Sequence, residues 1–163
     1  MIAPAVAVLS FTWLALLLAS PIGPTSLAAL TYGIGAFICH QLPERSFHLG
    51  GFQIPVCARC LGIYAGFALT ACLQMAMSFP TRAQGLTPSS ARRVFVAGAL
   101  PTALTLALEW SGVWPGSNNV RAIAGLMLGI GVALVVMSAV ATLHYSSCER
   151  RQPTEPSQLP PHI

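Results

Sequence analysis

The stretch from Cys39 to Tyr64 reads CHQLPERSFHLGGFQIPVCARCLGIY, and the rest of the chain is arranged around it. It holds three of the 5 cysteines and two of the 4 histidines of the chain, namely Cys39, Cys57, Cys60, His40 and His48. Thiolates and imidazoles are the ligands that zinc and related transition metals prefer. The double glycine at positions 50–51 predicts a tight hairpin turn between the two halves. The stretch therefore concentrates metal-binding and thiol chemistry between two apolar segments.

The composition places the chain in a membrane. Of its 163 residues, 55% are hydrophobic and 7% are charged, and the mean hydropathy is +0.70. A soluble domain carries about 25% charged residues. Long segments without charge instead indicate one integral membrane domain, residues 1–145, whose partner is the lipid bilayer. The net charge of +4 comes from arginines that lie between apolar segments, so it indicates orientation in a membrane and no nucleic-acid partner.

Five apolar segments predict an all-α, integral membrane helix bundle with five transmembrane helices. They lie near residues 2–19, 25–42, 56–79, 94–110 and 121–145. Segment 25–42 is barely long enough for the ~20 residues that a bilayer requires, and a re-entrant segment there would leave four spanning helices. Segment 2–19 has the length of a cleaved signal, but no basic residue precedes its apolar core, which favours a retained membrane helix. Residues 146–163 contain four prolines and are predicted to form a disordered tail.

Two glycine pairs predict which helices pack closely. Gly62 and Gly66 are four residues apart in the third segment, and Gly125 and Gly129 have the same spacing in the fifth. Such pairs let the backbone of another helix approach, because no side chain intervenes. We therefore expect both segments to make close helix contacts.

The arginines predict the orientation. Arg82, Arg92 and Arg93 gather in the connection after the third segment, and Arg150 and Arg151 lie in the tail. The positive-inside rule puts both regions, and hence the C-terminus, in the cytoplasm. The loops 43–55 and 111–120 are then outside, and with five spans the N-terminus is outside as well. The expected location is the cytoplasmic membrane of a bacterium.

The first function hypothesis is a site for zinc or another transition metal. Zinc favours four cysteine or histidine ligands, and a CxxC pair supplies two of them at a usable spacing. The predicted ligands are Cys39, His40, Cys57 and Cys60, with His48 as the alternative histidine. The residues predicted to surround them are Glu44, Arg45, Arg59, Tyr64, Glu109 and Arg121. Glu109 is also the candidate catalytic residue, because a carboxylate beside a metal-activated water is the usual hydrolytic arrangement. Whether such a site is structural, catalytic or used for metal handling stays open.

The second hypothesis is a membrane thiol-disulfide redox protein. Cys57 and Cys60 would be the exchanging pair, and Cys39 the resolving thiol. A cysteine at a helix N-terminus has its thiolate stabilised by the helix dipole, and Arg59 adds a positive charge. An outside location also permits disulfides.

The third hypothesis is a purely structural membrane protein. The cysteines are then packing residues or a plain disulfide. Ion pairs between Glu109 and Arg121 and between Glu44 and Arg45 would seal the bundle, because charges at membrane depth need partners. The sequence identifies neither a reaction nor an oligomeric state.

Three strings, CHQLPERSF, PVCARCLGIYAGF and SNNVRAIAGLMLGIG, resemble a family of small bacterial multi-pass membrane proteins that is catalogued as a domain of unknown function. The resemblance covers roughly residues 30–135 and rests on the patterns CHQxPxRS and CARCxGIYxG. The matching positions are Cys39, His40, Gln41, Pro43, Arg45, Ser46, Cys57, Arg59, Cys60, Gly62 and Tyr64. It implies a multi-pass membrane protein with a Cys/His site and supplies no activity. Segment 2–19 lies outside the shared part.

Overall fold

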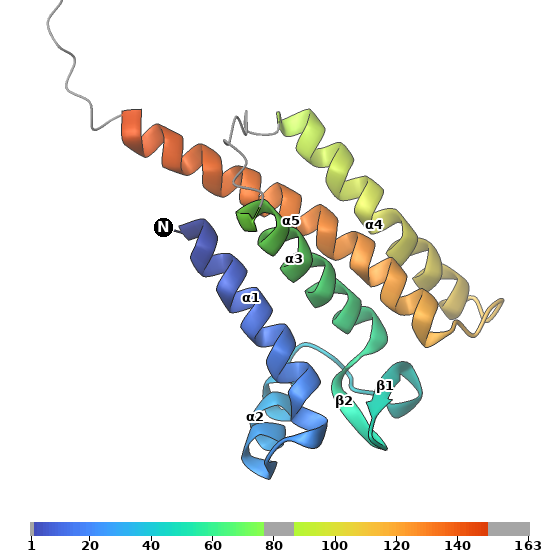
Figure 1. Cartoon of the computed structure of the whole chain (residues 1–163). Helices are drawn as coiled ribbons and strands as arrows, with labels where there is room; N and C mark the ends of the chain where they lie inside the picture. Colours follow the sequence, from blue (N-terminus) through green and yellow to red (C-terminus); the bar gives the residue numbers. More distant parts are fainter. Residues whose placement is uncertain (1, 77–86, 150–163) are drawn as a thin grey trace, which may run out of the picture.

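The structure is a computed structural model that describes residues 2–76 and 87–149. Its helices are α1 (Ile2–Ala19), α2 (Thr25–Ala36), α3 (Ala58–Ala76), α4 (Pro88–Trp110) and α5 (Asn118–Glu149), and its strands are β1 (Ser46–Leu49) and β2 (Phe52–Cys57). One 3-10 turn, Ser20–Ile22, follows α1, and a second, Pro43–Arg45, precedes β1. The four long helices lie in the order α1, α3, α5, α4, with the short helix and the hairpin at one end (Figure 1). The predicted all-α bundle is confirmed, with a small two-stranded sheet added.

Four of the described helices are long and apolar enough to cross a membrane. They are Ala3–Ile22, Ala58–Ala76, Pro88–Trp110 and Asn118–Val140. Helix α2 has only 12 residues, which at 1.5 Å per residue is about 18 Å and shorter than the ~30 Å hydrocarbon core. The alternative with four spanning helices is therefore the one that the structure supports.

Helix α2 ends six residues earlier than the predicted segment 25–42. Gln41 has φ of 50°, in the left-handed region, which no helix can continue through. Leu42 is extended (ψ 125°) because it precedes Pro43. The chain therefore leaves the helix before Cys39 and turns back toward the other helices.

The short α2 changes where the N-terminus lies. With four spanning helices, the start of α1 lies at the same end of the bundle as the start of α4 and the end of α5 (Figure 1). The prediction with five spans put the N-terminus on the side of the motif loop, whereas the alternative with four spans, which the helix lengths support, puts it at the opposite end. The motif and the 111–117 loop share the opposite end, as predicted.

Other helix boundaries also differ from the predicted ones, and α5 begins at Asn118 rather than at 121. Strand β2 takes positions 56–57, so α3 begins at Ala58, while 77–79 lie outside the described residues. Helix α4 begins at Pro88, because the Thr87 hydroxyl accepts a hydrogen bond from the Ser90 amide (3.3 Å) and proline is favoured in the first turn. Helix α5 reaches Glu149, so 146–149 are helical and the rest of the predicted tail lies outside the described residues.

The close helix contacts predicted at the two glycine pairs are confirmed, and the structure shows that the two helices, α3 and α5, contact each other. A Cβ on Gly62 would overlap the backbone oxygen of Ala122, and one on Gly66 that of Leu126. From the other side, a Cβ on Gly125 would overlap the backbone oxygen of Arg59. Close backbone approach through small residues is the usual way membrane helices associate. Helix α5 therefore fixes the position of the first turn of α3.

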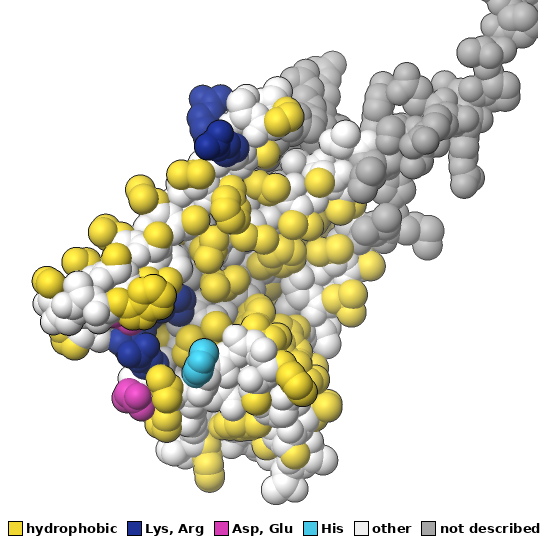
Figure 2. Space-filling model, turned by 180° about the vertical axis from the view of Figure 1, so that it is seen from behind, with side chains coloured by type: hydrophobic (Ala, Val, Ile, Leu, Met, Phe, Trp, Pro, Cys, Tyr) yellow, Lys and Arg dark blue, Asp and Glu magenta, His cyan; other side chains and the backbone are white. Residues whose placement is uncertain are grey.

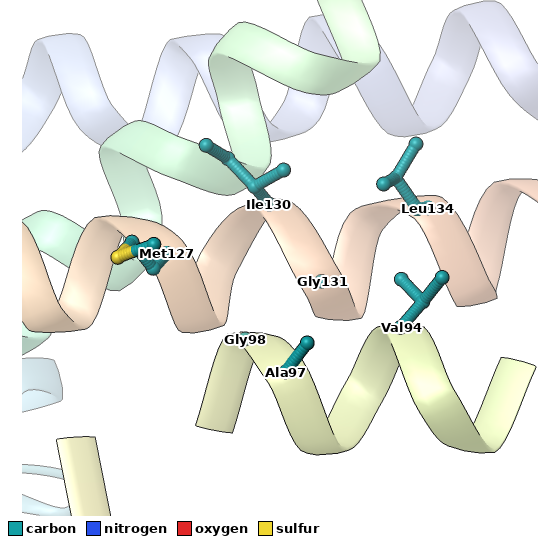
Figure 3. Close-up of a pocket in the computed structure, with 7 residues that line it drawn as sticks. All are labelled: Val94, Ala97, Gly98, Met127, Ile130, Gly131 and Leu134. Atoms are coloured by element: carbon teal, nitrogen blue, oxygen red, sulfur yellow. The ribbon is translucent and has the colours of Figure 1, made fainter. Parts of the chain in front are cut away.

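Helix α4 packs on the opposite side of α5 and leaves a shallow groove. The groove has a volume of about 280 Å³ and is lined by Val94, Ala97, Gly98, Met127, Ile130, Gly131 and Leu134 (Figure 3). Its lining is apolar, so it offers no chemical group. Hydrophobic side chains also cover much of the surface between two groups of basic side chains (Figure 2), as expected for lipid-facing helices.

The motif loop forms a β-hairpin. Leu49 pairs with Phe52 around Gly50 and Gly51, whose φ angles are 61° and 86°. Two positive φ angles define the type I′ turn that suits a two-residue hairpin, so the predicted turn is confirmed. The strands lose their regular register further on, where Ser46 pairs with Cys57.

Candidate metal centre

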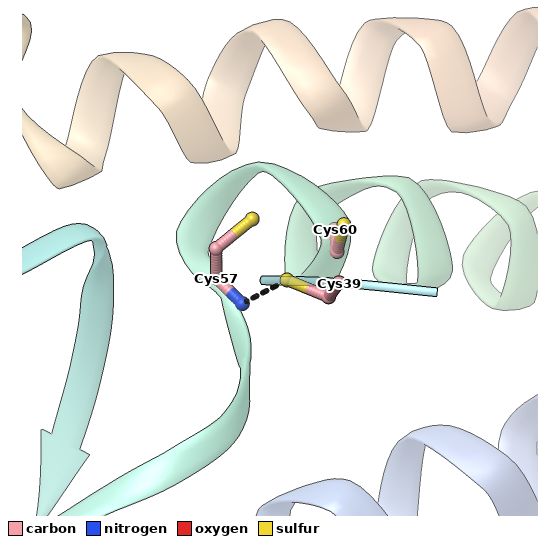
Figure 4. A group of neighbouring side chains, drawn as sticks. All are labelled: Cys39, Cys57 and Cys60. Atoms are coloured by element: carbon pink, nitrogen blue, oxygen red, sulfur yellow. Dashed lines mark hydrogen bonds between the residues drawn. The ribbon is translucent and has the colours of Figure 1, made fainter. Parts of the chain in front are cut away.

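Three cysteines from three elements meet where the hairpin joins α3. Cys39 lies in the loop after α2, Cys57 is the last residue of β2, and Cys60 lies in the first turn of α3. Their Sγ atoms all lie within 4.8 Å of one another (Figure 4). All three thiols are free. The backbone N–H of Cys57 donates a hydrogen bond to the Sγ atom of Cys39 (3.2 Å).

The cysteine cluster has apolar walls. Cys39 is only 8% exposed and packs with Leu17, Ile54 and Val56. The ring of Trp13 from α1 stands edge-on to that of Tyr64, with centroids 6.2 Å apart, and both rings pack against this group. Tyr64 therefore lies beside the cluster, as predicted. A dry apolar wall strengthens electrostatic interactions at the sulfurs.

The surroundings of Cys57 lower the pKa of its thiol. Hydrogen bonding from the Cys60 side chain lowers the pKa of Cys57 from 9.0 to about 5, against the opposing effect of burial. The backbone N–H groups of Cys60 and Arg59 add to the lowering of this pKa. The predicted effect of the helix N-terminus is thus present. The guanidinium of Arg59 instead binds Glu109 on the other side of α3.

Several predicted residues lie apart from the three sulfurs. His40 and His48 are exposed, and neither belongs to the group of close ligand atoms found among the described residues. Glu44 is exposed and Arg45 half-buried, and the described residues contain no ion pair between them. The predicted Glu44–Arg45 ion pair is therefore wrong: the Glu44 carboxylate is exposed, where water solvates it in place of Arg45.

A second, charged cluster lies at the same end of the bundle. Glu109 Oε1, at the end of α4, accepts hydrogen bonds from Arg59 Nη2 (3.0 Å) and from Arg121 Nε (3.1 Å). The Glu109 side chain is only 3% exposed. Arg59 Nη2 also donates to Thr105 Oγ1 (3.4 Å). The predicted Glu109–Arg121 pair is confirmed, and it is one half of a three-charge cluster that joins α3, α4 and α5.

The charged cluster reaches Cys57 by two routes. In the first, Arg59 is anchored to Glu109 and lies two residues after Cys57. In the second, Arg121 Nη1 donates to Asn118 Oδ1 (3.0 Å), and Asn118 Nδ2 donates to the backbone oxygen of Ser46 (3.1 Å). Ser46 is the strand partner of Cys57. The charged cluster is thus connected to the neighbourhood of Cys57 through α3 and through β1.

Two amides hold the loop that carries Cys39, and the sequence analysis assigned them no such role. Gln41 Nε2 donates to the backbone oxygens of Tyr32 (2.9 Å) and Pro55 (2.7 Å). Gln53 Nε2 donates to the backbone oxygen of Gln41 (2.6 Å). The available signal was the presence of two glutamines close to the cysteines in a chain with few polar residues. They fix Cys39 against β2.

Comparison with known proteins identifies relatives in archaea. The chain is 28% identical over 106 residues to an uncharacterised protein of Methanocaldococcus jannaschii, a match that covers 65% of each chain. It is 35% identical over 99 residues to an uncharacterised protein of Methanothermobacter thermautotrophicus, which covers 61% of this chain and 84% of the relative. The chain thus spans less than two thirds of the first relative. These two relatives do not support the bacterial source that the sequence resemblance implies. No solved structure matches the chain.

A family match covers the part of the chain that carries both clusters. Residues 39–135 match the family described as "Predicted membrane protein (DUF2085)", which is more than half of the chain. The match begins at Cys39, so α1 and α2 lie before it. It includes all three cysteines of the cluster and the three charged residues beside them. The chain therefore belongs to the predicted membrane protein family DUF2085.

Proposed function

We propose that Cys39, Cys57 and Cys60 bind one transition-metal ion, and that this ion is zinc. The observation that carries the proposal is the approach of the three Sγ atoms to within 4.8 Å of one another, from three separate elements. Ligand sulfurs about 2.3 Å from a tetrahedral zinc ion lie about 3.8 Å apart. Binding would then require the sulfurs to move closer by at most about 1 Å. Apolar walls and thiolate ligands favour a soft or borderline metal over magnesium or calcium.

The fourth coordination position decides what the site does. We assign it to His40, which follows Cys39 directly, with His48 as the alternative. Both histidines are exposed, so a ligand from this loop would close the site from the water side. If water occupies the position instead, the site has three protein ligands and one open position, as catalytic zinc sites do. Metal affinity in His40→Ala and His48→Ala separates these cases, because only loss of a ligand weakens binding.

The charged cluster supports a metal centre electrostatically. Zinc with three thiolates carries one excess negative charge, while Arg59, Arg121 and Glu109 together carry one excess positive charge. Charges at membrane depth are costly unless they are balanced nearby. Because Glu109 Oε1 already binds two arginines, we assign Glu109 the role of positioning α3 rather than that of a catalytic base. Tyr64 contributes to the wall of the site.

Metal analysis of the purified full chain tests the proposal. The wild-type protein should contain one zinc per chain, and Cys39→Ser, Cys57→Ser and Cys60→Ser should each lose most of it. Cys72→Ser is the matched control, because Cys72 is also a free thiol but does not belong to the cluster. Cobalt substitution gives a second measurement, since thiolate ligands produce charge-transfer absorption. Metal-free wild-type protein, or full zinc in Cys57→Ser, would refute the site.

Thiol redox chemistry is the second candidate function. The observation that favours it is the lowered pKa of Cys57, because a thiolate is the reactive form in disulfide exchange. Cys60 or Cys39 would then be the partner thiol. This function predicts metal-free protein in which mild oxidation forms a disulfide from Cys57 and dithiol reagents reduce it. Mass spectrometry of the purified protein, before and after reduction, separates this result from a metal centre.

We infer an orientation with the cysteine end outside a cytoplasmic membrane and the C-terminus in the cytoplasm. The support is Arg92 and Arg93, both exposed in the first turns of α4 at the opposite end of the bundle. With four spans, the N-terminus would be cytoplasmic too. In intact cells, a membrane-impermeant thiol reagent should modify His48→Cys and spare Ser89→Cys, as read by peptide mass spectrometry. The reverse pattern would invert the orientation.

A further inference from the structure

Helix α2 buries polar and small residues and exposes apolar ones, which is the opposite of a helix on a water-facing surface. Its inward face carries Thr31 and Gly35, both buried. Its outward face carries Leu30 and Ile34, which are exposed, and the chain continues outward through Phe37 (92% exposed) and Ile38 (60% exposed). A helix on a water-facing surface hides its apolar stripe and shows its polar one. The residues of α2 are therefore arranged for an apolar solvent.

The polar side chains in the second half of α2 are satisfied inside the protein, whereas Thr25 and Ser26 at its start are exposed. Thr31 Oγ1 donates to the backbone oxygen of Leu27 (2.9 Å), and the Tyr32 hydroxyl donates to the backbone oxygen of Gln53. Backbone groups around the helix end are paired as well, since Cys39 N–H donates to the Gly35 oxygen (2.8 Å). Internal satisfaction of polar groups is what a segment in lipid requires, because hydrocarbon offers no partner.

The apolar surface of α2 continues into its neighbours. Phe52, at the tip of the hairpin, is 63% exposed. The hairpin turn at Gly50 lies against the side chain of Ile22, which is itself exposed. Ile22 is the last residue of the span Ala3–Ile22. The surface formed by Ile22, Leu30, Ile34, Phe37, Ile38 and Phe52, which we call the α2 surface, is thus continuous with the lipid-facing side of α1.

We propose that the α2 surface is inserted into the membrane leaflet on the cysteine side, as a half-membrane segment that does not cross. Lipid is the occupant that fits, because the surface extends a spanning helix and a 12-residue helix reaches about half of the bilayer. The placement has a consequence for the cysteine cluster. Cys39 follows Ile38 directly, so the cluster lies at the boundary of lipid and water rather than out in the aqueous phase. The inference does not depend on whether a metal is bound.

Tryptophan fluorescence in reconstituted full-length protein tests the depth without adding thiols. The background replaces the native tryptophans (Trp13→Phe, Trp110→Phe, Trp114→Phe), and single tryptophans are placed by Phe37→Trp or Phe52→Trp. Glu44→Trp is the matched control, since Glu44 is an exposed polar residue at the same end of the bundle. Circular dichroism checks that each variant keeps its helices.

In phosphatidylcholine vesicles with brominated acyl chains, tryptophans at positions 37 and 52 should emit at shorter wavelength and lose most of their emission. The control should instead be quenched by aqueous iodide. If position 37 responds to iodide, or to neither quencher, the surface faces water or a protein partner and the inference is overturned. A phospholipid with a photoactivatable acyl chain provides the same measurement on the wild-type chain. Labels absent from residues 30–38 would refute the insertion, whatever the variants do.

Discussion

The amide of Cys57 donates a hydrogen bond to the Sγ atom of Cys39 across 18 positions of sequence, at 3.2 Å. Such a bond stabilises negative charge on the sulfur that accepts it. It also joins the loop after α2 to the end of β2, so the two halves of the motif meet at the cysteines. The cluster is therefore held by the backbone as well as by the packing of its walls.

Cys57 should be the fastest-reacting thiol in metal-free protein at mildly acidic pH. Its folded-state pKa is lowered from 9.0 to about 5, so its thiolate persists down to that pH. Alkylation by iodoacetamide, followed by peptide mass spectrometry, should rise around pH 5 in the folded chain. In the unfolded chain the same cysteine should gain reactivity only near pH 9.0.

The same shift contributes to stability. Because the folded pKa is the lower one, the contribution is fully present above pH 9.0 and is lost as the pH falls through about 5. Identical alkylation profiles in the folded and unfolded chains would contradict the lowered pKa.

Glu109→Gln should destabilise the protein by about 3 kcal/mol, because breaking a buried ion pair leaves charge without a partner. Two arginines lose their anion at once, and the Glu109 side chain is nearly inaccessible to water. The free energy of unfolding in mixed micelles measures the effect. Glu44→Gln, at an exposed carboxylate, should change it little. Equal stability of the two variants would show that the charged cluster does not hold α3, α4 and α5 together.

Gly62→Ala should weaken the contact between α3 and α5. The added methyl group would meet the backbone of Ala122, which cannot move without shifting α5. Overpacking of this kind costs about 1–3 kcal/mol. Gly33→Ala is the control, because no atom lies within 4 Å of a Cβ at that position. Thermal unfolding monitored by circular dichroism should rank Gly62→Ala well below Gly33→Ala, and the reverse order would contradict the close helix approach.

Gln41→Ala should loosen the loop that carries Cys39. The substitution leaves the backbone oxygens of Tyr32 and Pro55 without their donor, and an unsatisfied buried acceptor costs about 1–3 kcal/mol. Hydrogen exchange of the amides from 37 to 42 should become faster than in the wild type. Gln74→Ala, in the last turn of α3, is the control and should leave that exchange unchanged. Wild-type exchange in Gln41→Ala would exclude this role.

Much of the architecture follows from local features of the sequence. Charge-free segments of sufficient length require a membrane, because few polar groups are available for water. The spacing of Gly62 and Gly66 is enough to predict a close helix contact, since it depends only on helical periodicity and the absence of side chains. Gly50 and Gly51 are enough to predict the hairpin. These features involve residues close together in the chain.

Features that depend on residues far apart in the chain were decided only by the tertiary structure. The left-handed turn at Gln41, whose side-chain amide donates to the backbone oxygen of Pro55, keeps the chain from continuing as a helix to position 42, so α2 is too short to be a candidate span. The way the loop after α2 meets α3 brings the three cysteine sulfurs together and leaves both histidines outside that group. Glu109 forms ion pairs with both Arg59 and Arg121 because of the way α3, α4 and α5 pack. The sequence alone determined the class of protein and the candidate residues. Only the packing of distant segments determined which of those residues meet, because Coulomb and hydrogen-bond contacts act over a few ångströms in space and not along the chain.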